Sequence, residues 1–172
     1  MIDAAWALNR ARDYDAAIAL LADADTAAAL NARGFAYNGQ RNYARALLEL
    51  DRAALLEPGF ADVFNNRGYA FNGLKQFERA ITELTEAIRL DPTFADSFNG
   101  RGFALYGLGQ YPRALEDFDT ALCLEPDFAS AFYNRGRCFV ALDRMDAAAT
   151  DLAAAVRLDP RYATAIAALI AS

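Results

Sequence analysis

A period of 34 residues is the feature that most constrains how this chain of 172 residues can fold. Four kinds of marker residue repeat at this step in one common register. They are the pairs Arg33-Gly34, Arg67-Gly68, Arg101-Gly102 and Arg135-Gly136, the prolines Pro58, Pro92, Pro126 and Pro160, a first set of alanines at Ala46, Ala80, Ala114 and Ala148, and a second set at Ala53, Ala87, Ala121 and Ala155. A fixed period of this size is typical of a solenoid of stacked supersecondary units.

Each period predicts a helix, a turn and a second helix. In residues 95–128, Phe98, Gly102 and Leu105 have the i, i+4, i+7 spacing of one helix face. Pro112 suits the first turn of the second helix, and Pro126 ends it. No segment alternates with period two, so we expect no strands. The eleven predicted helices lie near residues 5–11, 14–24, 27–39, 43–56, 61–73, 77–90, 95–107, 111–124, 129–141, 145–158 and 163–170.

The repeated pattern resembles the tetratricopeptide repeat family. The residues that carry the resemblance are Phe64, Gly68, Phe71, Ala80, Leu84, Ala87 and Pro92, and then Phe98, Gly102, Leu105, Ala114, Phe118, Ala121 and Pro126. The resemblance implies an all-α, right-handed α-solenoid of about five repeats. We expect a single domain over residues 1–172, with a truncated repeat at 1–26, full repeats at 27–60, 61–94, 95–128 and 129–162, and a closing helix at 163–172.

Arginine stands before the glycine in all four full repeats, where the family usually has leucine. Each repeat also carries an acid sixteen residues later, namely Glu49, Glu83, Asp117 and Asp151. A half-buried guanidinium needs a partner, so we predict ion pairs between helices. The alternative is an arginine ladder for anionic ligands.

The candidate binding surface is a stripe on the first helices, rotated from the buried positions. In the family this face lines a concave groove for peptides, which implies the groove residues Asn31, Phe35, Asn38, Asn65, Tyr69, Asn72, Asn99, Phe103, Tyr106, Tyr133 and Arg137. Asparagine amides can bond a peptide backbone, and the aromatic residues can hold apolar side chains. The alternative is that these aromatic residues pack between repeats. We favour the groove because a pure core would exclude amides.

Some members of the family clamp a chaperone's C-terminal carboxylate with lysines, arginines and asparagines. The matching positions here offer one cation, Arg137, which argues against such a clamp. We therefore expect a neutral or apolar partner segment and not a strongly acidic tail.

Composition argues against catalysis and against several partner classes. The chain has no histidine, no phosphate-binding loop and no CxxC spacing, so we expect no enzyme, no cofactor and no metal. Cys138 aligns with core alanines and Cys123 with surface positions. A net charge of −6 argues against nucleic acid and anionic membranes. No secretory signal is evident, which predicts a cytoplasmic protein, although a chain whose signal had been removed would look the same.

The predicted function is a non-enzymatic adaptor that binds a peptide or protein segment in its groove. The alternatives are a self-assembling scaffold and a regulatory repeat domain of a larger enzyme. The uncharged C-terminal helix predicts either a weak homodimer, with Ile170 and the edge of Leu169 exposed, or a chain cut from a longer array.

Overall fold

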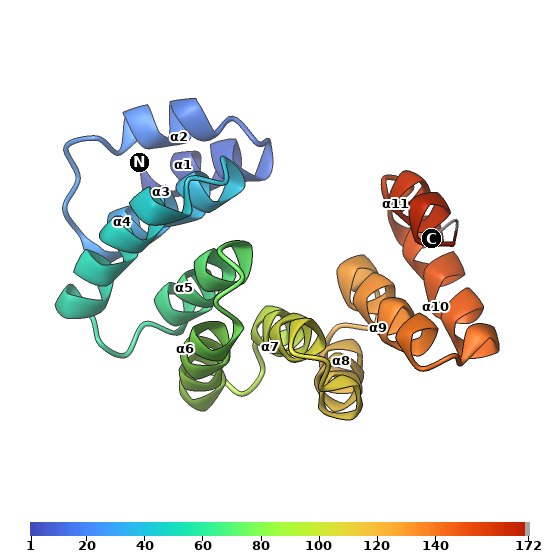
Figure 1. The fold of residues 1–172 in the computed structure, drawn as a ribbon. Coiled ribbons are helices and arrows are strands. Elements are labelled where there is room, and N and C mark those ends of the chain that lie inside the picture. Colours follow the sequence, from blue (N-terminus) through green and yellow to red (C-terminus); the bar gives the residue numbers. More distant parts are fainter. Residues whose placement is uncertain (171–172) are drawn as a thin grey trace. The chain divides into compact units, whose positions relative to one another are not determined.

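The computed structural model describes residues 1–170, which form eleven helices and no strand (Figure 1). The helices are α1 (Ile2–Arg10), α2 (Tyr14–Leu20), α3 (Ala27–Gly39), α4 (Tyr43–Leu56), α5 (Ala61–Gly73), α6 (Phe77–Leu90), α7 (Ala95–Gly107), α8 (Tyr111–Leu124), α9 (Ala129–Ala141), α10 (Met145–Leu158) and α11 (Tyr162–Ile170). Consecutive helices pair into five hairpins, and α11 follows the last of them. The predicted all-α architecture of stacked hairpins is confirmed.

The chain divides into two compact units at a repeat boundary. Unit 1 is Met1–Pro92 with α1 to α6, and unit 2 begins at Thr93 with α7 to α11. Within each unit the hairpins pack in chain order, because the first helix of a hairpin contacts the first helix of the next (α1 with α3, α3 with α5, α7 with α9). The handedness of the stack and the single domain over 1–172 stay predictions.

The helices α3 to α10 begin and end at the predicted residues, whereas the terminal helices differ. Helix α1 is Ile2–Arg10 instead of residues 5–11, and α11 begins at Tyr162, one residue early. Helix α2 ends at Leu20 instead of residue 24, because the carbonyl groups that follow accept hydrogen bonds from a side chain of the next hairpin. The Arg33 guanidinium donates to the carbonyls of Leu21, Ala22 and Ala24 at 2.6, 3.3 and 2.9 Å, which gives these groups partners outside a helix. The side chain of Ile170, whose exposure was predicted, lies outside the described residues.

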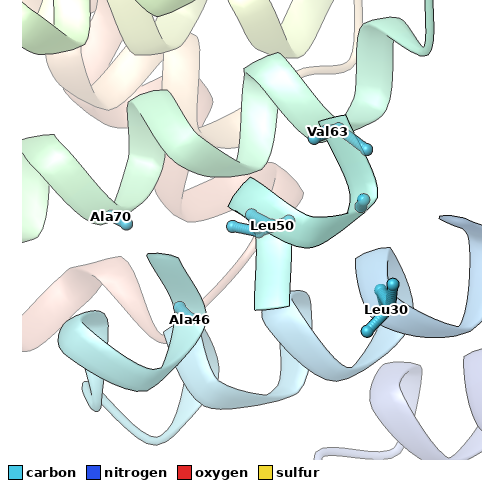
Figure 2. Packing of buried hydrophobic residues seen from close by; sticks show 6 residues of the cluster. Leu30, Ala46, Leu50, Val63 and Ala70 are labelled. Atoms are coloured by element: carbon cyan, nitrogen blue, oxygen red, sulfur yellow. The ribbon is translucent and has the colours of Figure 1, made fainter. Parts of the chain in front are cut away.

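Small and branched side chains fill the space between neighbouring helices. Figure 2 shows one such cluster, in which Leu30, Ala46, Leu50, Val63 and Ala70 come from α3, α4 and α5. The glycine of the Arg-Gly pair allows the close approach inside each hairpin. A Cβ on Gly34 would lie 2.5 Å from Cγ of the fully buried Leu50, so a larger residue would overpack the crossing.

Each hairpin reverses through one residue with positive φ, at the same place in every repeat. These residues are Arg12, Arg41, Lys75, Gly109 and Asp143, with φ from 57° to 72°. The left-handed residue turns the chain so that the second helix returns along the first.

The predicted arginine–acid pairs are confirmed in all four full repeats. The shortest distances are 2.6 Å for Arg33–Glu49, 3.1 Å for Arg67–Glu83, 2.8 Å for Arg101–Asp117 and 2.7 Å for Arg135–Asp151. Some of these arginines also lie within ion-pair distance of a second acid earlier in the chain, which the sequence reasoning missed: Arg33 lies 3.9 Å from Asp25, Arg67 lies 3.2 Å from Asp51, and Arg135 lies 2.6 Å from Asp119. The hydrogen bond that Arg135 donates to Asp151 is the largest cause that raises the pKa of Arg135 above its usual range. These contacts favour structural pairing over a ladder for anionic ligands.

Candidate functional site

The eleven predicted groove residues all lie on the first helices of their hairpins, and we call this surface the first-helix face. Unit 1 contributes Asn31, Phe35 and Asn38 from α3 and Asn65, Tyr69 and Asn72 from α5; unit 2 contributes Asn99, Phe103 and Tyr106 from α7 and Tyr133 and Arg137 from α9. The aromatic residues and Arg137 are half-buried, as is Asn38, whereas the other four asparagines are buried. These four asparagines therefore lie deeper in the face than the rings beside them.

An additional aromatic residue, Trp6, extends the first-helix face onto α1. Its ring lies 5.2 Å from the Phe35 ring in an edge-on arrangement. The sequence reasoning missed Trp6, although a signal was present: Tyr14 precedes Tyr43 by 29 residues, and the same offset aligns Trp6 with Phe35. Phe35 packs against the neighbouring hairpin and still keeps part of its surface exposed, so the groove and packing interpretations are both compatible with its position.

The asparagines of unit 1 link neighbouring first helices. The side-chain amide of Asn66 donates to Oδ1 of Asn31 at 2.8 Å, and that of Asn38 donates to the carbonyl of Asn66 at 2.8 Å. On α1, the Asn9 amide donates to the carbonyl of Ala32 at 2.9 Å. The argument that packing between repeats would exclude amides is therefore wrong, because these amides are satisfied in part by the next helix.

Some polar atoms of this network have no hydrogen-bond partner among the described residues. They are Nδ2 of Asn31 and Oδ1 of Asn38 and Asn9, and all three atoms are buried. A buried polar atom without a partner is costly, so each one favours an enclosed water as its partner.

The face of unit 2 contains a second polar network with an aromatic contact from the closing helix. The Asn134 amide donates to Oδ1 of Asn99 at 3.0 Å, and the Asn99 amide donates to Oγ of Ser130 at 3.2 Å. The Tyr162 ring on α11 lies 4.8 Å from the Tyr133 ring. Burial raises the pKa of Tyr162, and a hydrogen bond with Ser130 opposes that shift. The sequence reasoning did not place Tyr162 on this face.

Arg137 is surrounded by three rings of the same face. Its guanidinium carbon lies 4.4 Å from the Tyr106 ring centroid, 5.6 Å from that of Tyr133 and 5.8 Å from that of Phe103. All three distances are within the range of a cation–π contact. Arg137 therefore contacts three other residues of the predicted stripe.

The two cysteines of the chain lie in different environments. Burial raises the pKa of the Cys138 thiol to about 12, which keeps it protonated and unreactive at neutral pH. Cys123 is exposed, so both cysteines lie where predicted. Up to residue 169 we find no group of three His, Cys, Asp or Glu side chains arranged to hold a metal ion. Among the same residues, no helix is both long enough and apolar enough to span a bilayer.

A separate apolar surface lies on α4, the second helix of its hairpin. Leu48 and Leu55 are 66% and 83% exposed, and Leu56 is also exposed. Leu55 and Leu56 line a shallow pocket of 290 Å³ with Asp25 and Arg52. The sequence carries a signal for this surface that we did not use, because the positions matching Leu48 and Leu55 elsewhere hold Thr82, Glu116, Thr150, Arg89, Cys123 and Arg157.

Comparison with solved structures returns helical repeat proteins over most of the chain. A thermophilic TPR protein of Thermus thermophilus, TTC0263, is 21% identical, with a TM-score of 0.84 and 96% of each chain covered. YrrB, described as a TPR protein with an unusual peptide-binding site, is 24% identical over 97% of this chain and 89% of its own, with a TM-score of 0.67. The first TPR of Spaghetti (RPAP3), bound to the HSP90 peptide SRMEEVD, is 26% identical over 70% of this chain and 96% of its own, with a TM-score of 0.65.

Family comparison gives the same result from the sequence. The family described as tetratricopeptide repeat matches residues 100–170, and the related TPR repeat family matches residues 71–109. Comparison with curated proteins gave no significant match. The two family matches together run from residue 71 to residue 170, which is more than half of the chain. The chain belongs to the tetratricopeptide repeat family.

Proposed function

We propose that this protein is a non-enzymatic adaptor whose first-helix face binds a peptide or protein segment. Its fold is one that generally binds proteins and peptides. One observation carries the proposal: partly exposed rings and buried amides with unpartnered atoms lie together on the same helices. The rings can hold apolar side chains of the segment, and the amides buried beneath them hold the first helices together.

Two structural neighbours support a peptide as the ligand. YrrB has a peptide-binding site, and the RPAP3 repeat domain was solved with a bound peptide. The first-helix face also fits the expected neutral or apolar segment, because its predicted residues comprise amides, rings and the single cation Arg137.

Peptide selection on the immobilised protein tests the proposal, followed by titration of the selected peptides. Trp6 is the one tryptophan of the chain and lies on the first-helix face, so its fluorescence gives a label-free signal for unit 1. We expect a Tyr69→Ala/Asn72→Ala variant to weaken binding by about tenfold or more, as for the loss of an aromatic anchor. A Leu48→Gln/Leu55→Gln variant on α4 is the matched control and should bind like wild type.

The result that would contradict the proposal is equal affinity for wild type and the Tyr69→Ala/Asn72→Ala variant, with binding lost in the α4 control. Circular dichroism of each variant separates lost binding from lost folding.

Self-assembly through the C-terminal helix stays a prediction with weaker support. Ile166 and Leu169, the large aliphatic side chains described on α11, are half-buried, and the exposed positions Ala163, Thr164, Ala165, Ala167 and Ala168 are small. Light scattering over a concentration series tests it: a protein that stays monomeric at high concentration would rule out the homodimer.

A further inference from the structure

We infer that the apolar surface on α4 is a contact between two copies of this chain. The surface consists of Leu48, Leu55 and Leu56, which are 66%, 83% and 59% exposed, and it lies wholly within unit 1. It is separate from the first-helix face, because α4 is the second helix of its hairpin and packs against α3 and α5 through its other side. The inference therefore does not rest on the proposed function.

The exposed side of α4 is apolar along one line. Leu48 and Leu55 are seven residues apart, which is two helical turns, so they lie on the same line along the helix. The exposed Ala44, one turn before Leu48, continues this line. The corresponding positions of the other full repeats hold no large aliphatic residue: they are Glu78, Pro112, Asp146, Thr82, Glu116, Thr150, Arg89, Cys123 and Arg157. Apolar side chains scattered singly on a surface are normal, whereas a continuous line of them indicates an interaction surface.

Two opposite charges flank this line, midway between Leu48 and Leu55. Asp51 faces the following hairpin, because it lies 3.2 Å from Arg67 of α5, and its side chain is 56% exposed. Arg52 faces the preceding hairpin, because it lies 2.8 Å from Asp25, and its side chain is 51% exposed. Both charges therefore remain partly available to a partner at the middle of the apolar surface.

This arrangement is complementary to itself about a twofold axis parallel to α4. Such an axis places Leu48 and Leu55 of one copy against the same residues of the other, and it brings Asp51 of each copy beside Arg52 of the other. An antiparallel pairing of the two helices would instead place Asp51 against Asp51 and Arg52 against Arg52, which repel. Because the surface is its own complement in the parallel arrangement, a second copy of the chain is the partner that it fits.

The shape of the surface fits the same arrangement. The shallow pocket of 290 Å³ lies on the Arg52 side of the apolar line, where Leu55 and Leu56 form part of its wall. The twofold axis places Leu55 of each copy at the edge of the other copy's pocket. Three leucines from each copy make a small interface, and small interfaces form weak, transient complexes. We expect a dissociation constant of about 0.1 mM, so the protein is monomeric at the micromolar concentrations of an unfolding experiment.

Sedimentation equilibrium of the full chain tests the contact, at concentrations from about 10 μM to about 1 mM. We expect wild type to dimerise over this range and Leu48→Gln/Leu55→Gln to associate at least about tenfold more weakly. Leu124→Gln is the control, since Leu124 is an exposed leucine at the end of another second helix, α8, and this variant should associate like wild type. Circular dichroism of each variant separates lost association from lost folding.

Charge reversal tests the parallel arrangement. Arg52→Asp and Asp51→Arg should each weaken dimerisation by about tenfold, because two attractive contacts become repulsive. A mixture of the two variants should recover dimerisation, since each of these contacts then joins an arginine to an aspartate. General attraction does not explain such a recovery, because both variants keep a net negative charge. Arg157→Asp on α10 changes the net charge by the same amount as Arg52→Asp and should dimerise like wild type.

Three results would overturn the inference. The first is a wild type that stays monomeric at about 1 mM. The second is a dimer that is equally strong in Leu48→Gln/Leu55→Gln, which would place the contact elsewhere, such as on α11. The third is a mixture of Arg52→Asp and Asp51→Arg that associates no more strongly than either variant alone.

Discussion

The two acids that flank Arg135 should contribute very unequally to stability, although both lie within hydrogen-bond distance of it. Asp151 accepts from Nε at 2.7 Å and from Nη2 at 2.8 Å, and its side chain is 5% exposed. Asp119 accepts from Nη1 at 2.6 Å, but its side chain is 61% exposed. Water screens the second contact and not the first, so the buried bidentate pair dominates.

We expect Asp151→Asn to lower the free energy of unfolding by about 2–3 kcal/mol. The estimate is below the cost of breaking a fully buried pair because the Arg135 side chain is 21% exposed and keeps Asp119. Asp119→Asn should cost less than about 1 kcal/mol. The Arg135→Met/Asp151→Leu double variant should lose less than Asp151→Asn, because it leaves no unpaired buried charge.

Urea denaturation followed by circular dichroism measures all three variants, with midpoint and slope compared so that a change in cooperativity is recognised. Equal costs for Asp119→Asn and Asp151→Asn, or a cost below about 1 kcal/mol for Asp151→Asn, would refute the reasoning from burial.

Three further predictions concern packing, exposure and pH. Gly34→Ala should lower the free energy of unfolding by about 1–2 kcal/mol, since overpacking against Leu50 outweighs the helical preference for alanine. Gly59→Ala is the control: no atom lies within 4 Å of its added Cβ, so its free energy of unfolding should stay within about 0.5 kcal/mol of wild type in the same urea assay. Leu48→Gln and Leu55→Gln should each change the free energy of unfolding by less than about 0.5 kcal/mol, because both side chains are exposed. A larger loss in thermal denaturation would show that another surface covers these side chains of α4. Burial raises the pKa of Glu83 above its ordinary 4.5, so the wild type loses stability as pH rises through the folded-state value. The difference in stability between Glu83→Gln and wild type should therefore shift in favour of the variant as pH rises from about 4 to 7, whatever the variant loses at all pH values by breaking the pair with Arg67. A shift in favour of wild type over that range would contradict the assignment.

Much of the fold was predictable because the same marker residues recur at the same positions in each full repeat. The markers that recur every 34 residues fix both helices of each full hairpin, and α3 to α10 have the predicted bounds. The pairing of Arg101 with Asp117 was predictable in the same way, since a half-buried guanidinium and an acid recur at constant separation. The end of α2 was not predictable, because it depends on where Arg33 finds carbonyl groups.

The candidate site was less predictable, because it depends on how neighbouring first helices are rotated. Spacing along one helix placed Asn31 and Asn38 on a common stripe, but the bonds that they make with Asn66 exist only once two helices are packed. The position of Tyr162 beside Tyr133 likewise depends on how α11 lies against α9. Trp6 is different, since a 29-residue offset in the sequence would have identified it.

Photo-crosslinking of a selected peptide tests most directly whether the first-helix face is the binding surface. A benzophenone amino acid is introduced at Tyr69 on α5 and, in a separate variant, at the exposed Leu55 on α4. The account predicts a crosslink from position 69 that excess unlabelled peptide abolishes, and none from position 55. A crosslink from position 55 alone, equally abolished by competing peptide, would place the ligand on α4 and contradict the account.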